Sequence, residues 1–361
     1  MGSAPAAVEP SAQPDGFRLL WFGLGFFWLL DAALQLQPAM FTSAFSQGVL
    51  WNSAYMYQPP GLRGFLATAA GIESAHLVAL NALIVAVQVL TGALLFSRRT
   101  RTAGLLLGLG WGLAVWVFGE GLGFMATGTA LSEGGAPGSS LMYAVLSLIG
   151  LVALRRGARA GLTAARLTWS GYWLLGAALH IPIRYGVGAV LAYNLQTAAQ
   201  DLPGPLSKLD YAAAHQAYVH SLASLLLVVV VEVAVGLGIW WRPLRRPALL
   251  AGVLVSVPFW VLGQAMGSIT TGIATDPDTA PLVALLGILL WRLRDGGGAL
   301  APREADPYVG HEAPRAGARG LLPPGLDARP AEAHNAGPMA AVTVAASWRN
   351  WPTGGEVSAR A

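Results

Sequence analysis

The sequence contains no cysteine and few charged residues. Among its 361 residues the absence of cysteine excludes disulfides, thiolate metal sites and thiol catalysis. Charged residues make up 11% of the chain and hydrophobic residues 55%. Soluble domains carry about 25% charged residues. This shortage of charge predicts an integral membrane protein whose main partner is the lipid bilayer.

Several functional signatures are also missing. The chain has no phosphate-binding P-loop, no dinucleotide fingerprint and no Gly-x-Ser-x-Gly nucleophile elbow. Its six histidines lack the paired arrangement expected of a haem-binding bundle. The isoelectric point is near 9.6, but the basic residues stand at the ends of apolar runs and form no patch. They therefore indicate membrane topology, and no nucleic-acid partner is expected.

One stretch of the chain occurs twice. Residues 116–137 and 260–281 align without a gap at an offset of 144, and nine of 22 positions are identical. The segment 28–34 likewise matches 173–179 at an offset of 145. A long fixed period predicts one structural module written in tandem.

Hydropathy predicts an all-α polytopic membrane protein. About 20 apolar residues cross a bilayer core. Eight runs approach that length, so we expect eight transmembrane helices in two tandem four-helix bundles related as parallel repeats. The eight runs are 18–37, 65–96, 103–125, 139–154, 168–184, 212–241, 247–271 and 281–291. The predicted domains are a disordered N-terminus (1–17), a first module (18–155), a cytoplasmic linker (156–167), a second module (168–294) and a disordered cytoplasmic tail (295–361).

The basic residues predict the orientation of the spans. Thirteen of them fall on one side of the expected membrane, whereas the opposite loops hold only Arg63, Arg184 and Lys208. The positive-inside rule then places both termini in the cytoplasm of a multi-pass cell-membrane protein. The outer loops, 40–65 and 185–212, are aromatic and contain Pro-Gly pairs. Each could lie on the outer leaflet as a surface helix or cover a pocket as a lid.

Small residues recur at helical spacing in the third and seventh runs. Gly104, Gly108 and Gly112 form a stripe in the third run, which predicts close helix packing in lipid. Two further sets are spaced four, three and four residues apart, as on one helical face. These sets are Trp116, Glu120, Gly123 and Thr127, and Trp260, Gln264, Gly267 and Thr271. The carboxylate of Glu120 inside a span fits either a structural hydrogen bond or a functional site.

Polar residues from separate spans fall at one expected depth. In the first module we expect a ligand pocket open to the outer leaflet, with Trp116 and Thr127 on the same face as Glu120. Its polar layer consists of Asp31, Gln35, Glu73, His76 and Glu120. The corresponding layer of the second module holds His180, His215, His220 and Gln264, without carboxylates. Gln88 and Glu232 lie nearer mid-span without an obvious partner, which favours a packing role.

The chemistry of this layer leaves three readings open. Glu73 and His76 are three residues apart, so both could reach one metal ion. This motif occurs once, because Ala217 replaces the glutamate in the second copy. We therefore predict no metal site, and Glu73 and His76 are the only candidates. The layer could instead bind the headgroup of a quinone or other lipid, or be purely structural.

The four-helix module resembles the DoxX/DoxD-like membrane superfamily. The resemblance rests on helix count, hydropathy and the Leu-rich first span that ends in Asp31-Ala-Ala-Leu-Gln35. The resemblance implies that this four-helix fold is present twice in the chain, and that the protein associates loosely with quinones and membrane redox subunits. Our first hypothesis is a quinone- or lipid-interacting subunit of a membrane redox system. The alternatives are a small-molecule transporter and a scaffold without ligand, and the sequence assigns no catalytic residue.

Overall fold

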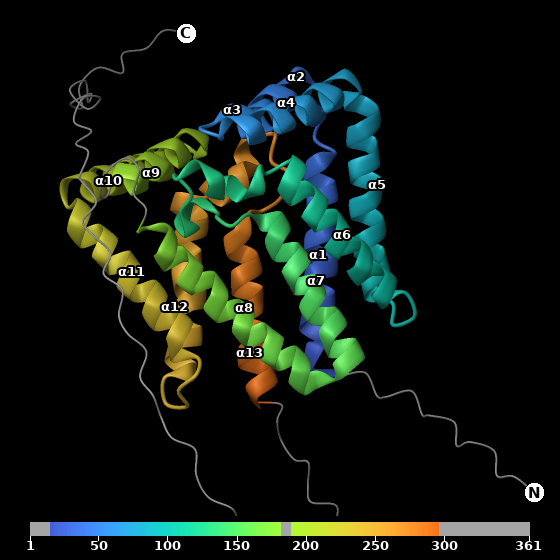
Figure 1. Cartoon of the computed structure of the whole chain (residues 1–361), viewed down its shortest axis with the longest axis vertical. Helices are drawn as coiled ribbons and strands as arrows, with labels where there is room; N and C mark the ends of the chain where they lie inside the picture. Colours follow the sequence, from blue (N-terminus) through green and yellow to red (C-terminus); the bar gives the residue numbers. More distant parts are fainter. Residues whose placement is uncertain (1–14, 182–188, 296–361) are drawn as a thin grey trace, which may run out of the picture. The chain divides into compact units, whose positions relative to one another are not determined.

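The computed structural model describes residues 15–181 and 189–295 (Figure 1), and this part of the chain is helical throughout, without strands. Five of its helical segments are long and apolar enough to cross a membrane. They are α5 (Leu77–Phe96), α6 (Arg101–Phe118), α7 (Ser139–Arg156), α11 (Ser221–Gly238) and the segment Arg245–Gly263, which begins with α12 (Arg245–Pro258). The structure therefore agrees with an integral membrane protein. The expected disordered ends, 1–17 and 295–361, and Arg184 fall largely outside the described residues.

Three further long helices run beside these five. They are α1 (Arg18–Gln35), α8 (Ala158–Leu179) and α13 (Thr279–Asp295). Along the first half, α1 packs on α5, α5 on α6 and α6 on α7. The second half repeats this order, with α8 on α11, α11 on α12 and α12 on α13. The halves meet where α7 and α13 contact each other, and each of the two also contacts both α1 and α8.

Two of the expected spans are broken by a histidine. His76, with φ −124°, ends α4 (Pro60–Ala75) just before α5 begins. His220, with φ −107°, ends α10 (Gly204–Val219) just before α11. Runs 65–96 and 212–241 were thus wrongly predicted as single helices. The first part of each run carries polar residues on a surface helix, so only the second part has the uniform apolarity of a span.

Short helices lie across one end of the long ones (Figure 1). In the first half these are α2 (Ser43–Phe45), α3 (Asn52–Tyr55) and α4, and in the second half α9 (Ala189–Asp201) and α10. They occupy the two loops in which the sequence predicted surface helices or a lid. The predicted linker 156–167 is also mostly helical, because α8 starts at Ala158 and only Gly157 separates it from α7.

The third and seventh spans stop earlier than predicted. α6 ends at Phe118, and the four residues Gly121 to Phe124 all have positive φ, between 54° and 61°. The second half repeats this left-handed turn at Ala265 to Ser268, with φ between 47° and 70°. Trp116, Glu120, Gly123 and Thr127 therefore do not share one helical face. A left-handed turn of L-residues costs about 1–2 kcal/mol per non-glycine residue, so the surrounding contacts must hold it in place.

The predicted glycine stripe does pack closely. A Cβ atom on Gly112 would lie 2.7 Å from the Ser140 carbonyl oxygen, and one on Gly108 would lie 2.9 Å from Ser147 Oγ. Both neighbours belong to α7, so the missing side chains allow α6 and α7 to approach each other. A continuous apolar core that includes Trp21, Trp169 and Trp173 joins the two halves.

Candidate functional site

Glu120 follows the end of α6 and anchors the start of α7. Its Oε1 atom accepts hydrogen bonds from Ser139 Oγ at 2.7 Å and from the Ser140 N–H at 2.9 Å. In the second half, Gln264 Oε1 accepts a hydrogen bond from the Ala280 N–H at 2.9 Å. Each side chain thus satisfies a backbone N–H in the first turn of the next long helix, 20 residues later for Glu120 and 16 residues later for Gln264.

In each half, a nearby tryptophan also links the end of one helix to the residues just before the next. The indole N–H of Trp116 donates to the Pro137 carbonyl, and that of Trp260 donates to the Pro277 carbonyl, both at 2.8 Å. The gapless sequence alignment had paired Pro137 with Pro281, which the structure corrects. The second loop is four residues shorter, so the offset changes from 144 at Trp116 and Trp260 to 140 at the two prolines.

The first half contains a pocket between α1, α5, α6 and α7, which we call the lateral pocket. Its volume is about 220 Å³, and its walls are mainly aromatic and aliphatic. Four of the predicted residues line it: Asp31, Gln35, Glu73 and Glu120. His76 is exposed at the bend between α4 and α5, and neither Trp116 nor Thr127 reaches the pocket.

The lateral pocket is surrounded by polar atoms that lack partners. In the described part of the chain, 13 buried side-chain nitrogen or oxygen atoms have no hydrogen-bond partner. Seven of these 13 belong to residues that line the lateral pocket. They are Trp28 Nε1, Asp31 Oδ1, Glu73 Oε1, Gln88 Oε1, Trp111 Nε1, Glu120 Oε2 and Tyr143 Oη. The side chains of Asp31 and Tyr143 interact with each other, which leaves five atoms outside this pair. Buried polar groups are normally paired, so this concentration calls for a chemical explanation.

Gln35 is held at the rim of the pocket by a residue that the sequence did not single out. Its side-chain amide donates to Asn81 Oδ1, and Asn81 Nδ2 donates back to the Gln35 carbonyl at 3.1 Å. Asn81 is completely buried near the start of α5. An asparagine within a strongly apolar span was the signal that could have identified it.

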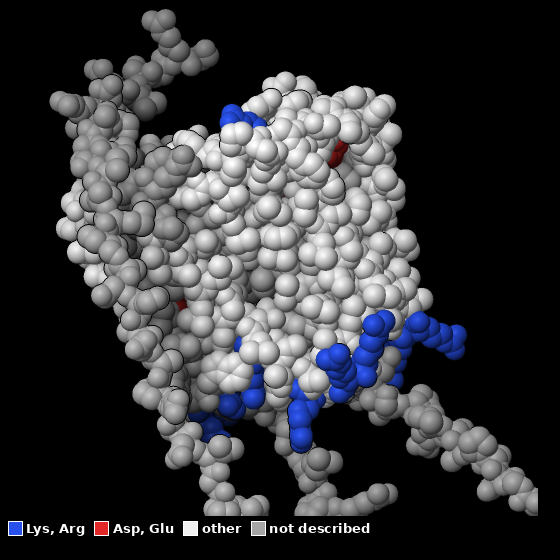
Figure 2. All heavy atoms as spheres, viewed as in Figure 1, with Lys and Arg blue, Asp and Glu red and all other residues white. Residues whose placement is uncertain are grey.

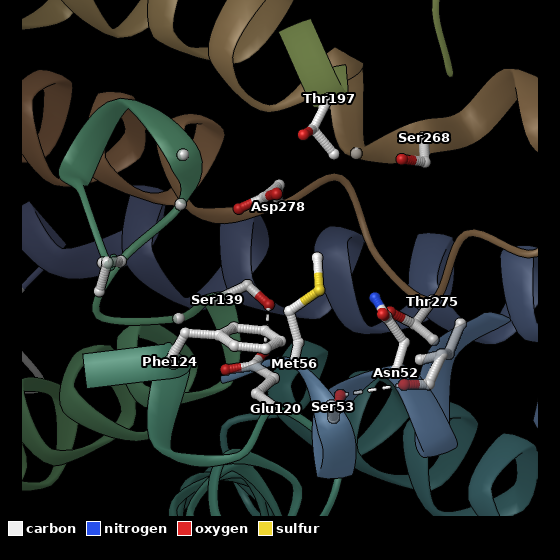
Figure 3. Close-up of a pocket in the computed structure, with 18 of the residues that line it drawn as sticks. Asn52, Ser53, Met56, Glu120, Phe124, Ser139, Thr197, Ser268, Thr275 and Asp278 are labelled. Atoms are coloured by element: carbon white, nitrogen blue, oxygen red, sulfur yellow. Dashed lines mark hydrogen bonds between the residues drawn. The ribbon is translucent and has the colours of Figure 1, made fainter. Parts of the chain in front are cut away.

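A second, larger cavity lies between the two halves, and we call it the central cavity (Figure 3). Its volume is about 380 Å³. Both left-handed turns contribute to its wall, through Phe124 and Ser268, and the surface helices contribute Asn52 and Thr197. Its charged lining residues are all acidic: Glu120, Asp276 and Asp278. Glu120 and Asp276 also line the lateral pocket, so these two residues stand in the wall between the cavities.

These acidic side chains are buried close together, and this raises the pKa of two of them. Burial, followed by the charge of Asp276, raises the pKa of Glu120 to about 7. Burial and then Asp276 also raise the pKa of Asp278, which precedes α13, to about 8. Both carboxyls can therefore change protonation state near neutral pH, which makes them suited to hold or release a proton.

The second half holds a buried cluster in the corresponding position. His180 Nε2 lies 3.2 Å from Glu133 Oε1, and His180 Nδ1 lies 3.4 Å from Glu232 Oε2. We call Glu133, His180 and Glu232 the buried triad. We had expected the polar layer around His180 to contain no carboxylates and Glu232 to have no obvious partner, whereas the structure brings Glu133 and Glu232 to His180. Glu133 comes from the loop of the first half, just as Asp276 from the second half reaches the lateral pocket.

The remaining predicted residues of the second half do not join this cluster. His215 and His220 are exposed. Trp260 and Gln264 hold the loop before α13, as described above. Thr271 Oγ donates to the Ser268 carbonyl at 2.8 Å, in the same way that Thr127 Oγ donates to the Phe124 carbonyl at 2.7 Å. Both threonines thus brace the left-handed turns, which is a structural role.

The chain was compared with protein-family models, with curated proteins and with solved structures, and no match was found in any of the three. The resemblance to DoxX/DoxD-like proteins thus remains a prediction from helix count and the first span. Any function has to be argued from the residues that line the cavities.

Proposed function

We propose that the protein crosses the membrane eight times, as two tandem four-helix modules with both termini in the cytoplasm. The matching order of helix contacts in the two halves supports this arrangement. So do the hydrogen bonds of Trp116 and Glu120, which Trp260 and Gln264 repeat. Most of the Lys and Arg side chains on the face shown in Figure 2 gather at the end away from α2, α3 and α4. That end would face the cytoplasm.

We further propose that the lateral pocket binds the polar headgroup of a quinone or of another ring-bearing lipid. The observation that carries this proposal is the concentration of polar atoms without a hydrogen-bond partner around a small apolar pocket, five of them outside the Asp31–Tyr143 pair. A volume of about 220 Å³ is below the roughly 300–1,000 Å³ typical of drug-sized ligand sites. It suits one ring or headgroup whose tail extends into the bilayer.

The unpaired atoms match the chemistry of such a ring. Trp28 and Trp111 offer N–H donors to a carbonyl oxygen, whereas Glu120 can accept from a hydroxyl group. Asp31 and Tyr143 interact with each other, and the carboxylate of Asp31 has further lone pairs to accept with. A ligand that exchanges carbonyl for hydroxyl groups could thus be held in both forms. Since Glu120 titrates near pH 7, it could also take up a released proton. A role as a subunit that serves other membrane redox proteins would follow from this binding.

The test is native purification followed by mass spectrometry of the lipids and quinones that remain bound. The wild-type protein should retain a ring-bearing lipid in near-stoichiometric amount. Asp31→Asn should lower its occupancy several-fold, because Asp31 lines the lateral pocket and not the central cavity. Asp210→Asn is the matched control, because this buried carboxylate on α10 lines neither cavity. Equal retention in wild type and Asp31→Asn, or only bulk phospholipid in both, would count against the proposal.

A small-molecule transporter is the second candidate, and the backbone of the central cavity favours it. Irregular backbone at membrane depth occurs where it lines a cavity, and transporters place such interruptions at the interface of their repeats. Both left-handed turns follow directly on a span and line the central cavity, as such an interruption would. Because the chain has no cysteine, a Thr275→Cys variant would report access to the cavity wall. Labelling by an impermeant maleimide from both sides of the membrane would support transport, and labelling from one side only would oppose it.

A further inference from the structure

The buried triad has more lone pairs than hydrogen-bond donors. Glu133, His180 and Glu232 are 3%, 2% and 0% exposed. His180 Nδ1 lies 2.8 Å from the Gly176 carbonyl oxygen, which can only accept, so Nδ1 carries the hydrogen. The Nε2 lone pair of the neutral ring therefore faces Glu133 Oε1 at 3.2 Å. Two lone pairs at this distance repel each other unless a cation lies between them. That cation is either a proton on Nε2, which makes His180 an imidazolium paired with both glutamates, or a metal ion.

The hydroxyl group of Ser132 cannot supply what is missing. Its oxygen lies 3.1 Å from Glu133 Oε2 and also contacts Glu232 Oε1, yet it has one hydrogen to donate. Glu232 Oε2 accepts no hydrogen bond, and its polar neighbour is His180 Nδ1 at 3.4 Å, whose hydrogen points to the Gly176 carbonyl. Four carboxylate oxygens and one imidazole nitrogen thus converge with a single O–H donor among them. Burying two carboxylates without compensating positive charge is costly.

We propose that the buried triad is a binding site for one divalent transition-metal ion of the zinc class. The triad provides three ligand atoms, one from each residue, within 4.8 Å of one another. Nitrogen and oxygen ligands at about 2.0–2.1 Å in a tetrahedral shell stand about 3.3 Å apart. The contact between His180 Nε2 and Glu133 Oε1 already has this length. The longest separation among the three ligand atoms, at most 4.8 Å, has to shorten by up to about 1.5 Å to complete the shell.

The surroundings of His180 match those of a metal ligand. Metal-bound histidines commonly donate their second N–H to a backbone carbonyl, which fixes the tautomer, and the contact with Gly176 does so here. A side chain on Gly176 would obstruct the site, because a Cβ atom there would lie 2.4 Å from Glu232 Oε1. Imidazole together with carboxylates suits zinc, manganese or iron better than calcium or magnesium.

The first half does not repeat this site. At the offsets of 145 and 144, Gln35 takes the place of His180, and Gln88 takes the place of Glu232. Neither amide is a strong ligand for a transition metal. The two halves would therefore have diverged into a pocket for a neutral ring and a site for a cation. The inference is independent of the proposed function, because none of the triad residues lines the lateral pocket.

The test is the metal content of protein purified in detergent without chelator or affinity nickel, followed by stripping and calorimetric titration with Zn²⁺. We expect about one equivalent per chain. His180→Ala should weaken Zn²⁺ binding by on the order of 100-fold or more. Cobalt provides a second readout, since Co²⁺ in this site should give a visible d–d absorption band that the variant lacks.

Two further variants keep the test decisive. His220→Ala removes an exposed histidine at the bend before α11 and should keep the full equivalent of zinc. Glu232→Gln retains the shape and the acceptor for Ser132, so it should fold even if His180→Ala does not, and it should still lose zinc. Wild-type protein that binds no more Zn²⁺ than Glu232→Gln would overturn the proposal and leave a triad held together by protons alone.

Discussion

The Oε1 atom of Glu120 accepts a hydrogen bond from the backbone N–H of Ser140, which ties the end of α6 to the first turn of α7. The positive end of the α7 dipole stabilises the carboxylate, as an acidic side chain near a helix N-terminus generally does. The other oxygen of the same carboxylate is buried without a partner, and Glu120 lines both the lateral pocket and the central cavity. Glu120 thus has one structural oxygen and one that can interact with a ligand.

We predict that the Glu120→Gln variant folds and that its free energy of unfolding depends less on pH than that of the wild type. Burial and Asp276 raise the pKa of Glu120 to about 7 from its ordinary value of 4.5. The folded state binds this proton more tightly than the unfolded state does, so protonation of Glu120 adds to the free energy of unfolding. This contribution is fully present below about pH 4.5 and is lost as the pH rises through about 7. The loss amounts to no more than roughly 3 kcal/mol. Thermal unfolding in detergent between pH 4.5 and pH 8 should show this decline in the wild type and a flatter profile in the variant.

The second half provides the structural control for this substitution. Gln264 already performs the capping role with an amide, since its Oε1 accepts from Ala280. A Glu120→Gln variant that fails to insert or to fold would show that the negative charge itself is needed for assembly. A variant with an unchanged pH profile would show that Glu120 does not titrate near neutral pH.

The left-handed turn after α6 leads to a second prediction. Gly123 has φ +60°, and a Cβ atom there would lie 1.9 Å from the Pro137 carbonyl oxygen. Gly123→Ala should therefore destabilise the protein by at least about 2 kcal/mol, through backbone strain and overpacking. Gly110→Ala is the matched control, because Gly110 is helical and nothing lies within 4 Å of its added Cβ. That control should be neutral or should stabilise by about 0.5–1 kcal/mol. A thermal midpoint for Gly123→Ala equal to that of Gly110→Ala would contradict the structure of this turn.

The sequence allowed the main features of the first half to be predicted, because they depend on local pattern. Apolar runs and the internal repeat indicated the helical class. The shared depth of the predicted polar layer indicated four residues of the lateral pocket, which are Asp31, Gln35, Glu73 and Glu120. The prediction missed Gln88, Trp111 and Tyr143, which lie in the same pocket wall. Their positions depend on how the helices are rotated about their axes, which tertiary packing determines.

The buried triad could not be predicted from spacing. Glu133 lies 47 residues from His180, and Ser132 lies 100 residues from Glu232. The loop of one half reaches into the other, so the two partners belong to different copies of the repeat. The second loop is also four residues shorter than the first. A gapless alignment of the two halves therefore pairs the wrong residues after the left-handed turn. One signal was available, because a polar side chain recurs at the matched positions Gln88 and Glu232 within apolar spans.

The reciprocal change, Gln264→Glu, should be poorly tolerated at neutral pH. Gln264 Nε2 donates to the Ser132 carbonyl at 3.3 Å. An ionised glutamate would instead direct an oxygen at that carbonyl oxygen, close to Glu133. Loss of the donor and burial of a new charge should cost about 2–4 kcal/mol. Because a protonated glutamate can donate to the carbonyl, the thermal midpoint should recover on lowering the pH from 8 to 5. A midpoint independent of pH would show that the new side chain does not occupy the site of Gln264.

The proposed topology of eight membrane crossings can be tested by cysteine labelling, since the chain has no native cysteine to obscure the result. Gly61 and Gly204 begin the surface helices α4 and α10, and an added Cβ meets nothing within 4 Å at either position. If the two halves are parallel repeats, Gly61→Cys and Gly204→Cys should both react with an impermeant maleimide added to intact cells. Ser97→Cys and Arg242→Cys, exposed at the opposite ends of α5 and α11, should react only after the membrane is permeabilised. Labelling of Gly61→Cys and Gly204→Cys from opposite sides would replace the parallel arrangement by an inverted one, because an odd number of crossings would then separate the two helices.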